Sequence, residues 1–184
     1  MASARLFVAL MPPAAVRAEL AAQAVPLPGV RWTPEENLHL TLRFIGDTEP
    51  HKQTRMEQAL ARVRVEPFIL PVGDLGVFPS RGLAKVLWAG IGRGHPRLHQ
   101  LRQQVDEALL SVDPVLDVRN FHPHFTLGRP GDEHEAKALA RFLERHAQFE
   151  APPFRVSEFC LMASDLPPGR PPVYQIVRRF PLGR

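Results

Sequence analysis

The sequence predicts an α+β protein built from two similar lobes, each with an antiparallel sheet and outer helices. Segments with helical and with strand periodicity alternate along all 184 residues. One short motif also occurs twice, as His39-Leu40-Thr41-Leu42 and as His124-Phe125-Thr126-Leu127. If the elements around the two copies repeat as well, a pseudo-two-fold axis relates the lobes and places the two motifs opposite each other across a cleft.

The first half of the chain predicts a strand, a helix, the first motif strand, a second helix and a hairpin. The motif strand alternates clearly over 38–45, with Leu38, Leu40, Leu42 and Phe44 on one face and His39, Thr41 and Arg43 on the other. The remaining elements expected here are a strand over 5–10, helices over 14–24 and 51–63, and hairpin strands over 68–77 and 84–91.

The second half follows a similar order. It predicts a helix over 96–110, the second motif strand around 124–129, a helix over 132–147, and strands near 154–162 and 173–180. In each half a proline, Pro67 or Pro152, follows the motif histidine by 28 residues. We therefore interpret residues 1–184 as one bilobal domain with repeated halves of approximately 1–92 and 93–184.

The composition is that of a globular protein. Hydrophobic residues make up 45% of the chain, and no segment resembles a signal peptide or is apolar over the length of a membrane span. The single cysteine, Cys160, lies in an apolar run, which predicts a buried thiol rather than a nucleophile. We expect a cytoplasmic monomer. The net charge of +4, carried mostly by arginine, is compatible with a phosphate-bearing partner such as RNA.

The two motifs suggest phosphodiester chemistry. Residues i and i+2 of a strand project from one face, so His39 with Thr41, and His124 with Thr126, would each present an imidazole and a hydroxyl together. Histidine titrates near neutrality, so one imidazole can accept a proton while the other donates one. The threonine hydroxyls can donate hydrogen bonds to non-bridging phosphate oxygens.

Further residues are candidates for contacts with the substrate. Arg129 would add positive charge beside the phosphate, but strict alternation puts it on the face opposite His124, so a bulge or a strand end after Gly128 is required. Arg43 would meet phosphate or pair with a carboxylate. Three aromatic residues are assigned either to packing or to the substrate, with packing favoured for Trp32: Phe7, Trp32 and Tyr174. His122 shares the predicted face of His124 and would support that histidine or contact the substrate.

With both motifs placed, the chain resembles the 2H phosphoesterase superfamily, and most closely its bacterial and archaeal 2′-5′ RNA ligase / RNA 2′,3′-cyclic phosphodiesterase family. The resemblance covers nearly the whole length. It is carried by the two motifs and by the following flanking segments: 5–10 (RLFVAL), 30–32 (VRW), 44–46 (FIG), 86–90 (VLWAG), Gly128-Arg129, and Tyr174 with 180–182 (FPL).

The resemblance implies a bilobal fold with the active site in the cleft. It also implies hydrolysis of RNA or nucleotide 2′,3′-cyclic phosphate to a 2′-phosphate without a metal or other cofactor, with reversible 2′-5′ ligation in some members. In this family His39 would be the acid that protonates O3′ and His124 the base that activates water. The residues alone do not separate the two roles, because the motifs are so alike.

The sequence leaves two other functions open. The histidines and threonines would serve equally in a non-catalytic module that binds RNA or nucleotide phosphate. A metal hydrolase using His122 and His124 is the other alternative, although neither has a Cys, Asp or Glu at ligand spacing.

Overall fold

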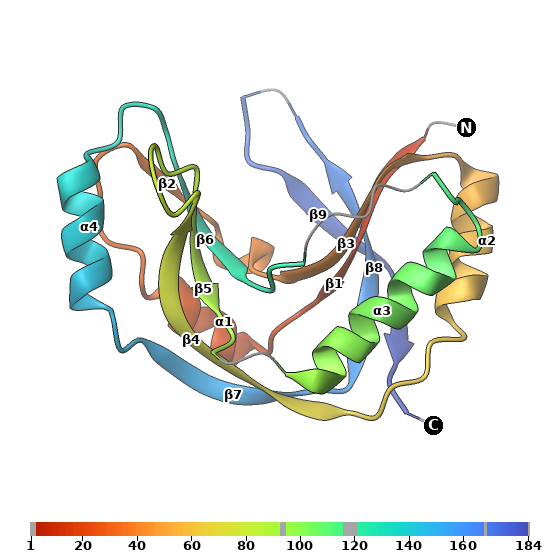
Figure 1. The fold of residues 1–184 in the computed structure, drawn as a ribbon. Coiled ribbons are helices and arrows are strands. Elements are labelled where there is room, and N and C mark those ends of the chain that lie inside the picture. The colour runs from red at the N-terminus through yellow and green to blue at the C-terminus, as the bar shows by residue number, and fades with distance from the viewer. Residues whose placement is uncertain (1–2, 93–94, 116–120, 168, 184) are drawn as a thin grey trace.

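Seven strands were expected from the sequence, and the described residues form nine (Figure 1). The computed structural model describes residues 3–92, 95–115, 121–167 and 169–183. Its strands are β1 (Ala4–Leu10), β2 (Val30–Trp32), β3 (Leu40–Thr48), β4 (Phe68–Phe78), β5 (Val86–Gly90), β6 (Phe125–Pro130), β7 (Glu150–Val156), β8 (Glu158–Asp165) and β9 (Val173–Pro181). The short β2 was not predicted, and the single strand expected near 154–162 falls on two strands, β7 and β8.

The four α-helices also agree with the sequence, apart from their ends. They are α1 (Ala14–Ala21), α2 (Pro50–Leu60), α3 (Pro96–Leu110) and α4 (Ala136–Arg145), and a 3₁₀ turn, η1, spans Glu35–Asn37. Helices α2 and α3 each have a proline in the first turn, where a missing N–H leaves no hydrogen bond unmade. Among the described residues, no helix combines the length and the apolar character needed to cross a membrane.

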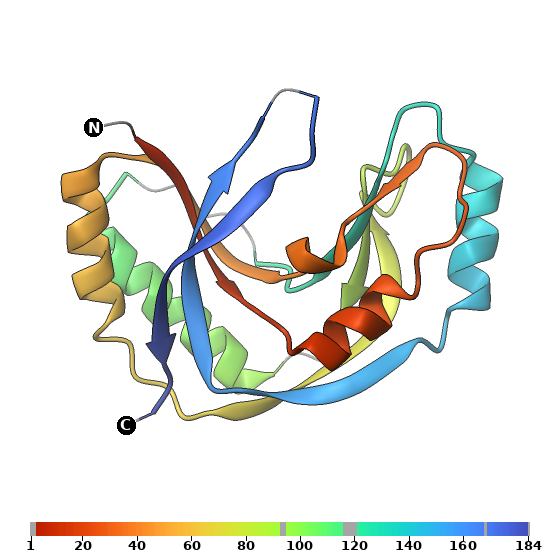
Figure 2. The ribbon, with the colours of Figure 1, turned by 180° about the vertical axis from the view of Figure 1, so that it is seen from behind.

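The strands form one curved antiparallel sheet with the order β7-β4-β5-β6-β3-β1-β8-β9, and β2 pairs with β6. Two lobes rise on either side of its centre (Figure 1). Lobe 1 contains β1, β3, β8 and β9 with α2 and α3, and lobe 2 contains β2, β4, β5, β6 and β7 with α4. Helix α1 packs against β7 and η1 and is seen clearly from behind in Figure 2.

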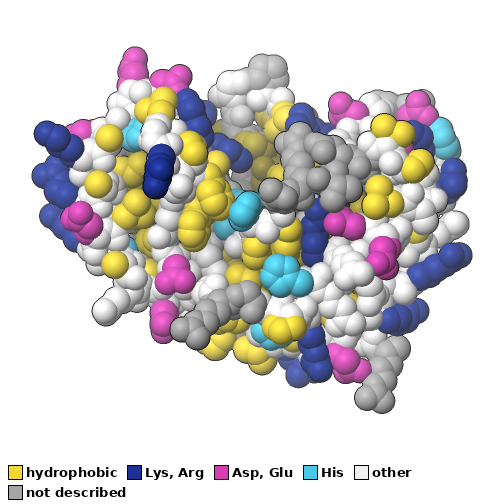
Figure 3. All heavy atoms as spheres, viewed as in Figure 1, with side chains coloured by type: hydrophobic (Ala, Val, Ile, Leu, Met, Phe, Trp, Pro, Cys, Tyr) yellow, Lys and Arg dark blue, Asp and Glu magenta, His cyan; other side chains and the backbone are white. Residues whose placement is uncertain are grey.

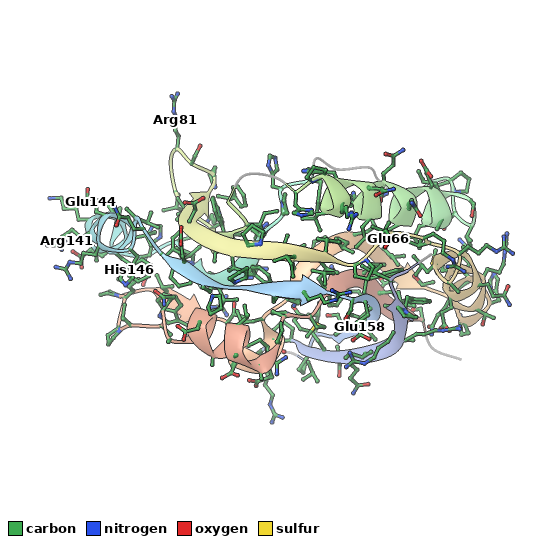
Figure 4. All side chains as sticks on the ribbon, turned by 90° about the horizontal axis from the view of Figure 1, so that it is seen from below. Glu66, Arg81, Arg141, Glu144, His146 and Glu158 are labelled. Carbon is green, nitrogen blue, oxygen red and sulfur yellow. The ribbon has the colours of Figure 1, made fainter. Side chains whose placement is uncertain are left out.

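The lobes are joined at two places. At the centre of the sheet, one pair of residues, Leu40 and Phe125, connects β3 to β6. At the base, β4 and β7 run side by side, as Figure 4 shows from below, and the chain continues from β7 of lobe 2 into β8 of lobe 1. The first junction therefore lies directly beside both motifs.

Each lobe combines strands from both halves of the sequence. The predicted hairpin forms as β4 and β5, but it pairs with β6 and β7 instead of with the first motif strand. Read outward from the centre, the order is β3–β1–β8 in lobe 1 and β6–β5–β4 in lobe 2. In lobe 2, strand β5 thus occupies the position that β1 occupies in lobe 1. The two sequence halves, residues 1–92 and 93–184, do not coincide with the two lobes.

The main core lies on the face of the sheet that the helices cover, where the side chains of Leu6, Val8 and Leu10 of β1 are buried. The opposite, concave face of lobe 1 carries a smaller buried cluster of Phe7, Ala9, Cys160 and Met162. Burial raises the pKa of the Cys160 thiol to about 11, so the thiol stays protonated at neutral pH.

Candidate active site

The two His-x-Thr motifs meet at the centre of the sheet. Leu40 pairs with Phe125 in antiparallel register, and both side chains are fully buried in the main core. The flanking residues point to the opposite, concave face. The register sets His39 across from Thr126 and Thr41 across from His124. Figure 3 shows histidine side chains in the hollow between the lobes.

Both motif imidazoles are oriented in the same way. Nδ1 of His39 lies 2.7 Å from the carbonyl oxygen of Asn37, and Nδ1 of His124 lies 2.6 Å from that of His122. A carbonyl oxygen only accepts, so each Nδ1 carries the hydrogen. This tautomer leaves Nε2 of each neutral ring free to accept a proton.

The pKa of each motif histidine is lowered from its ordinary value of 6.5. Burial is the largest cause for both His39 and His124, and it outweighs the stabilising hydrogen bond to the backbone carbonyl. The positive charge of Arg129 lowers both pKa values further. In the free protein both rings are therefore mainly neutral at pH 7.

A β-bulge brings Arg129 to this site. Across β5 and β6 the register passes from Trp88–Thr126 to Leu87–Gly128, so Leu127 has no partner. The bulge lies one residue earlier than expected and reverses the alternation after it. Arg129 is exposed, and its charge acts on His39, His124 and Tyr174.

A bulge at the corresponding place in β3 overturns the prediction for Arg43. The register with β1 passes from Ala9–Thr41 to Val8–Arg43 and skips Leu42. Arg43 therefore points away from His39 and Thr41. Its side chain is 3% exposed and lies 3.5 Å from the carboxylate of Asp106 on α3. Of the two roles considered for Arg43, pairing with a carboxylate is correct and contact with the substrate is wrong.

The same bulge exposes a residue that the sequence analysis missed. Phe44 was expected in the core, yet it is 69% exposed and lies 6.2 Å, between ring centroids, from Phe7. Phe44 follows His39 by five residues, as Arg129 follows His124. If the bulge expected in the second motif strand had been applied to the first motif strand as well, the sequence would have predicted the exposed position of Phe44.

Comparison with known proteins agrees with these geometric features. Residues 12–167 match the family described as the 2'-5' RNA ligase superfamily. The chain belongs to this superfamily. An RNA 2′,3′-cyclic phosphodiesterase of Aeropyrum pernix is 33% identical over 153 residues, which cover 83% of this chain and 85% of that protein.

Solved structures of this superfamily have the same fold. The crystal structure of E. coli LigT in apo form superposes with a TM-score of 0.81 at 27% identity and covers 100% of both chains. The complex of LigT with 3′-AMP gives a TM-score of 0.78 at 28% identity, with 99% of each chain covered. The predicted bilobal α+β fold is thereby confirmed.

Aromatic rings flank each motif histidine in this member of the superfamily. The rings of Phe7 and Tyr174 each lie 5.0 Å from the ring of His39. On lobe 2, the ring of Phe78 lies 5.2 Å from His124 and 5.8 Å from His122. Phe7, Tyr174 and His122 therefore lie near the motifs, and Phe78 is a further ring there that the sequence analysis did not name.

Trp32 does not contact this site. Its ring packs edge-on against Phe142 of α4 at 5.7 Å, and its indole N–H donates to the carbonyl oxygen of Val25 at 2.8 Å. The packing role that the sequence favoured for Trp32 is correct, and contact with the substrate is not supported. The other tryptophan, Trp88, pairs across the strands with Thr126.

Asn37 connects the first motif to a distant segment. Its side-chain amide donates to the carbonyl oxygen of Pro172 at 2.9 Å, while its own backbone carbonyl receives the His39 hydrogen bond. Pro172 lies two residues before Tyr174, which contacts His39. Asn37 thereby helps to fix both sides of the His39 ring.

As for metals, the described part of the chain has no group of three or more His, Cys, Asp or Glu suited to holding one.

Proposed function

We propose that this protein hydrolyses the 2′,3′-cyclic phosphate at RNA or nucleotide ends to a 2′-phosphate, using two histidines. The observation that carries the proposal is the meeting of the two His-x-Thr motifs at the Leu40–Phe125 pair, where each histidine bonds a backbone carbonyl through Nδ1 and so keeps Nε2 as the proton acceptor of its neutral ring. The names of the curated relatives and the binding of 3′-AMP by LigT support the same substrate class.

The chemistry needs a base and an acid on opposite sides of the phosphorus. In an in-line displacement, one histidine takes a proton from water as its oxygen attacks phosphorus. The bond from phosphorus to O3′ breaks, and the second histidine gives a proton to O3′. The phosphate remains on O2′. Because the motifs come from different lobes, the arrangement suits this opposed geometry.

Three side chains are proposed to stabilise the phosphate. Thr41 and Thr126 would donate hydrogen bonds to its non-bridging oxygens, and Arg129 would add a positive charge that acts on both histidines. Preorganised donors of this kind stabilise the charge that builds up in the transition state.

Exposure favours His39 as the acid and His124 as the base. His39 is partly buried between the rings of Phe7 and Tyr174, whereas His124 is more exposed. Water reaches the more open side, and the ribose that carries O3′ lies on the other. The anionic substrate would raise the pKa of His39, which favours the protonated form that an acid requires.

Ligation follows from the same geometry. If the 5′-hydroxyl of a nucleoside replaces water, the product is a 2′-5′ phosphodiester. The strained cyclic phosphate already supplies the activation, so no nucleotide energy source is needed.

Turnover of a nucleoside 2′,3′-cyclic phosphate in EDTA tests the function. We expect the parent protein to form a 2′-phosphate and both His39→Ala and His124→Ala to lose about 10²–10⁴-fold in kcat. His51→Ala is the matched control, because His51 lies exposed on α2. Binding without turnover in the parent would instead identify a phosphate-binding module, and loss of turnover in EDTA would identify a metal hydrolase.

A further inference from the structure

The concave face of lobe 2 carries an aromatic surface that hydrolysis by water does not require. We call it the lobe 2 platform, and it consists of Phe78, Trp88 and His122. The rings of Phe78 and Trp88 are stacked, with centroids 5.1 Å apart and planes 28° from parallel. Phe78 also contacts the rings of His122 and His124. The platform thus extends outward from the catalytic histidine of this lobe.

Two glycines keep the platform flat against the sheet. A Cβ atom at Gly76 would lie 2.3 Å from Cζ2 of Trp88, and one at Gly90 would lie 3.1 Å from Cζ3. The indole therefore rests directly on the backbone of β4 and β5. Its strand partner is Thr126, so the platform begins beside a proposed phosphate donor. Flat aromatic side chains in such positions stack on nucleobases regardless of base identity.

The in-line geometry decides which nucleoside this surface would meet. The attacking and departing oxygens occupy opposite sides of phosphorus. If O3′ and its ribose lie toward His39 on lobe 1, the attacking oxygen lies toward His124 on lobe 2. Water needs no surface there, whereas a nucleoside with a 5′-hydroxyl does.

We propose that the lobe 2 platform is a subsite for the nucleoside that supplies the 5′-hydroxyl in 2′-5′ bond formation. This inference rests on the proposed function. The 5′-oxygen attacks the cyclic phosphorus and gives its proton to His124, the bond from phosphorus to O3′ breaks, and His39 protonates O3′. In the reverse reaction O3′ gives its proton to His39 and attacks phosphorus, the bond from phosphorus to the 5′-oxygen breaks as that oxygen takes a proton from His124, and the nucleoside is released from the platform.

Two reactions of the same protein separate the subsite from the catalytic centre. Hydrolysis of adenosine 2′,3′-cyclic phosphate needs no second nucleoside, whereas cleavage of 2′-5′-linked adenylyl adenosine does. The quantity compared is kcat/KM for diester cleavage divided by kcat/KM for hydrolysis. For Phe78→Ala we expect this ratio to fall on the order of tenfold, as for the loss of one base-stacking contact. Phe78→Leu, which keeps apolar volume but removes the ring, should lower the ratio similarly, and Phe78→Trp should restore it.

The matched control is Phe44→Ala, the same substitution on the concave face of lobe 1. Because Phe44 lies on the side assigned to the shared nucleoside, the ratio should stay as in the parent. The acidic limb of the pH profile for hydrolysis, which the base His124 sets, reports whether Phe78→Ala disturbs that neighbouring histidine.

The outcomes are distinguishable. An unchanged ratio in both Phe78→Ala and Phe78→Leu would overturn the subsite. The same holds if the parent protein hydrolyses the cyclic phosphate but neither cleaves the diester nor transfers the phosphoryl group to millimolar adenosine. In both cases the proposed function stands. If the parent does not hydrolyse the cyclic phosphate at all, the proposed function and the subsite fail together.

Discussion

At the scale of single residues, the two histidines have equivalent hydrogen bonds but different surroundings. Each donates from Nδ1 to the carbonyl oxygen two residues earlier, which orients the ring without any charged partner. This hydrogen bond favours the charged ring, but burial outweighs it for both histidines. Burial and the charge of Arg129 both favour the neutral ring.

This environment predicts an acidic optimum. The profile of kcat/KM reflects the free enzyme and needs one ring protonated and one neutral, so it should peak below pH 6.5 and fall as the pH rises further. The phosphate anion stabilises the imidazolium in the complex, so the alkaline limb of kcat should lie at higher pH than that of kcat/KM. Steady-state kinetics on a cyclic mononucleotide from pH 4.5 to pH 9 measure both, and a kcat/KM limb above pH 7 would contradict the prediction.

At the scale of elements, paired bulges decide what each motif strand presents to the site. Both skip the residue after the threonine, Leu42 in β3 and Leu127 in β6. The fifth residue after each histidine is thereby turned to the concave face. Lobe 2 places the cation Arg129 there and lobe 1 the aromatic Phe44, so equivalent positions contribute charge on one side and a flat apolar surface on the other.

The β3 bulge also creates an ionic cluster behind the site. Asp106 of α3 contacts both Arg43 and Arg102, and the guanidinium of Arg102 lies 5.4 Å from the ring centroid of Phe121. Burial and the neighbouring Arg43 lower the pKa of Arg102 to about 10, so Arg102 remains charged at neutral pH. One carboxylate therefore holds two buried cations together, between the first motif strand and the segment that leads to the second motif.

Removing the shared carboxylate should destabilise the fold more than removing one cation. Asp106→Asn removes the charge that contacts both Arg43 and Arg102, and we expect it to cost about 3 kcal/mol in the free energy of unfolding. Arg43→Met keeps the volume and leaves the Asp106–Arg102 pair, so it should cost clearly less. Urea denaturation of both variants measures the difference, and equal losses would show that Asp106 does not hold the cluster together.

At the scale of the whole molecule, the lobes are interleaved and depend on each other. Strand β4 pairs with β5 along one part of its length and with β7 along another. After β7, the chain returns to lobe 1 as β8 and β9. Neither half of the sequence contains a complete sheet. Both motif histidines lie beside the Leu40–Phe125 pair, which joins the lobes at the centre of the sheet. Both lobes must therefore fold to assemble the site.

We therefore expect the two lobes to unfold together. Both tryptophans, Trp32 and Trp88, belong to lobe 2, so their fluorescence reports that lobe, while far-ultraviolet circular dichroism reports the whole chain. The urea transitions measured by the two signals should coincide. A fluorescence midpoint separate from the dichroism midpoint would mean that the lobes are independent.

The sequence by itself determined the element types, the duplicated motif, the packing role of Trp32 and the burial of Cys160. These depend on local periodicity and on apolar runs, which neighbouring residues suffice to define. The expected side-chain directions held only as far as the first bulge. A bulge shifts the register by one residue and turns every later side chain to the other face, so Arg43 and Phe44 exchanged their expected places.

The tertiary structure alone decided which strands share a lobe. The hairpin of β4 and β5 looks complete in sequence, but its outer partners come from the second half of the chain. Pairing between strands distant in sequence is set by competition among all available edges, which no local pattern records. The same long-range pairing brings Phe78 and Trp88 beside His124, and so it created the lobe 2 platform that the sequence did not predict.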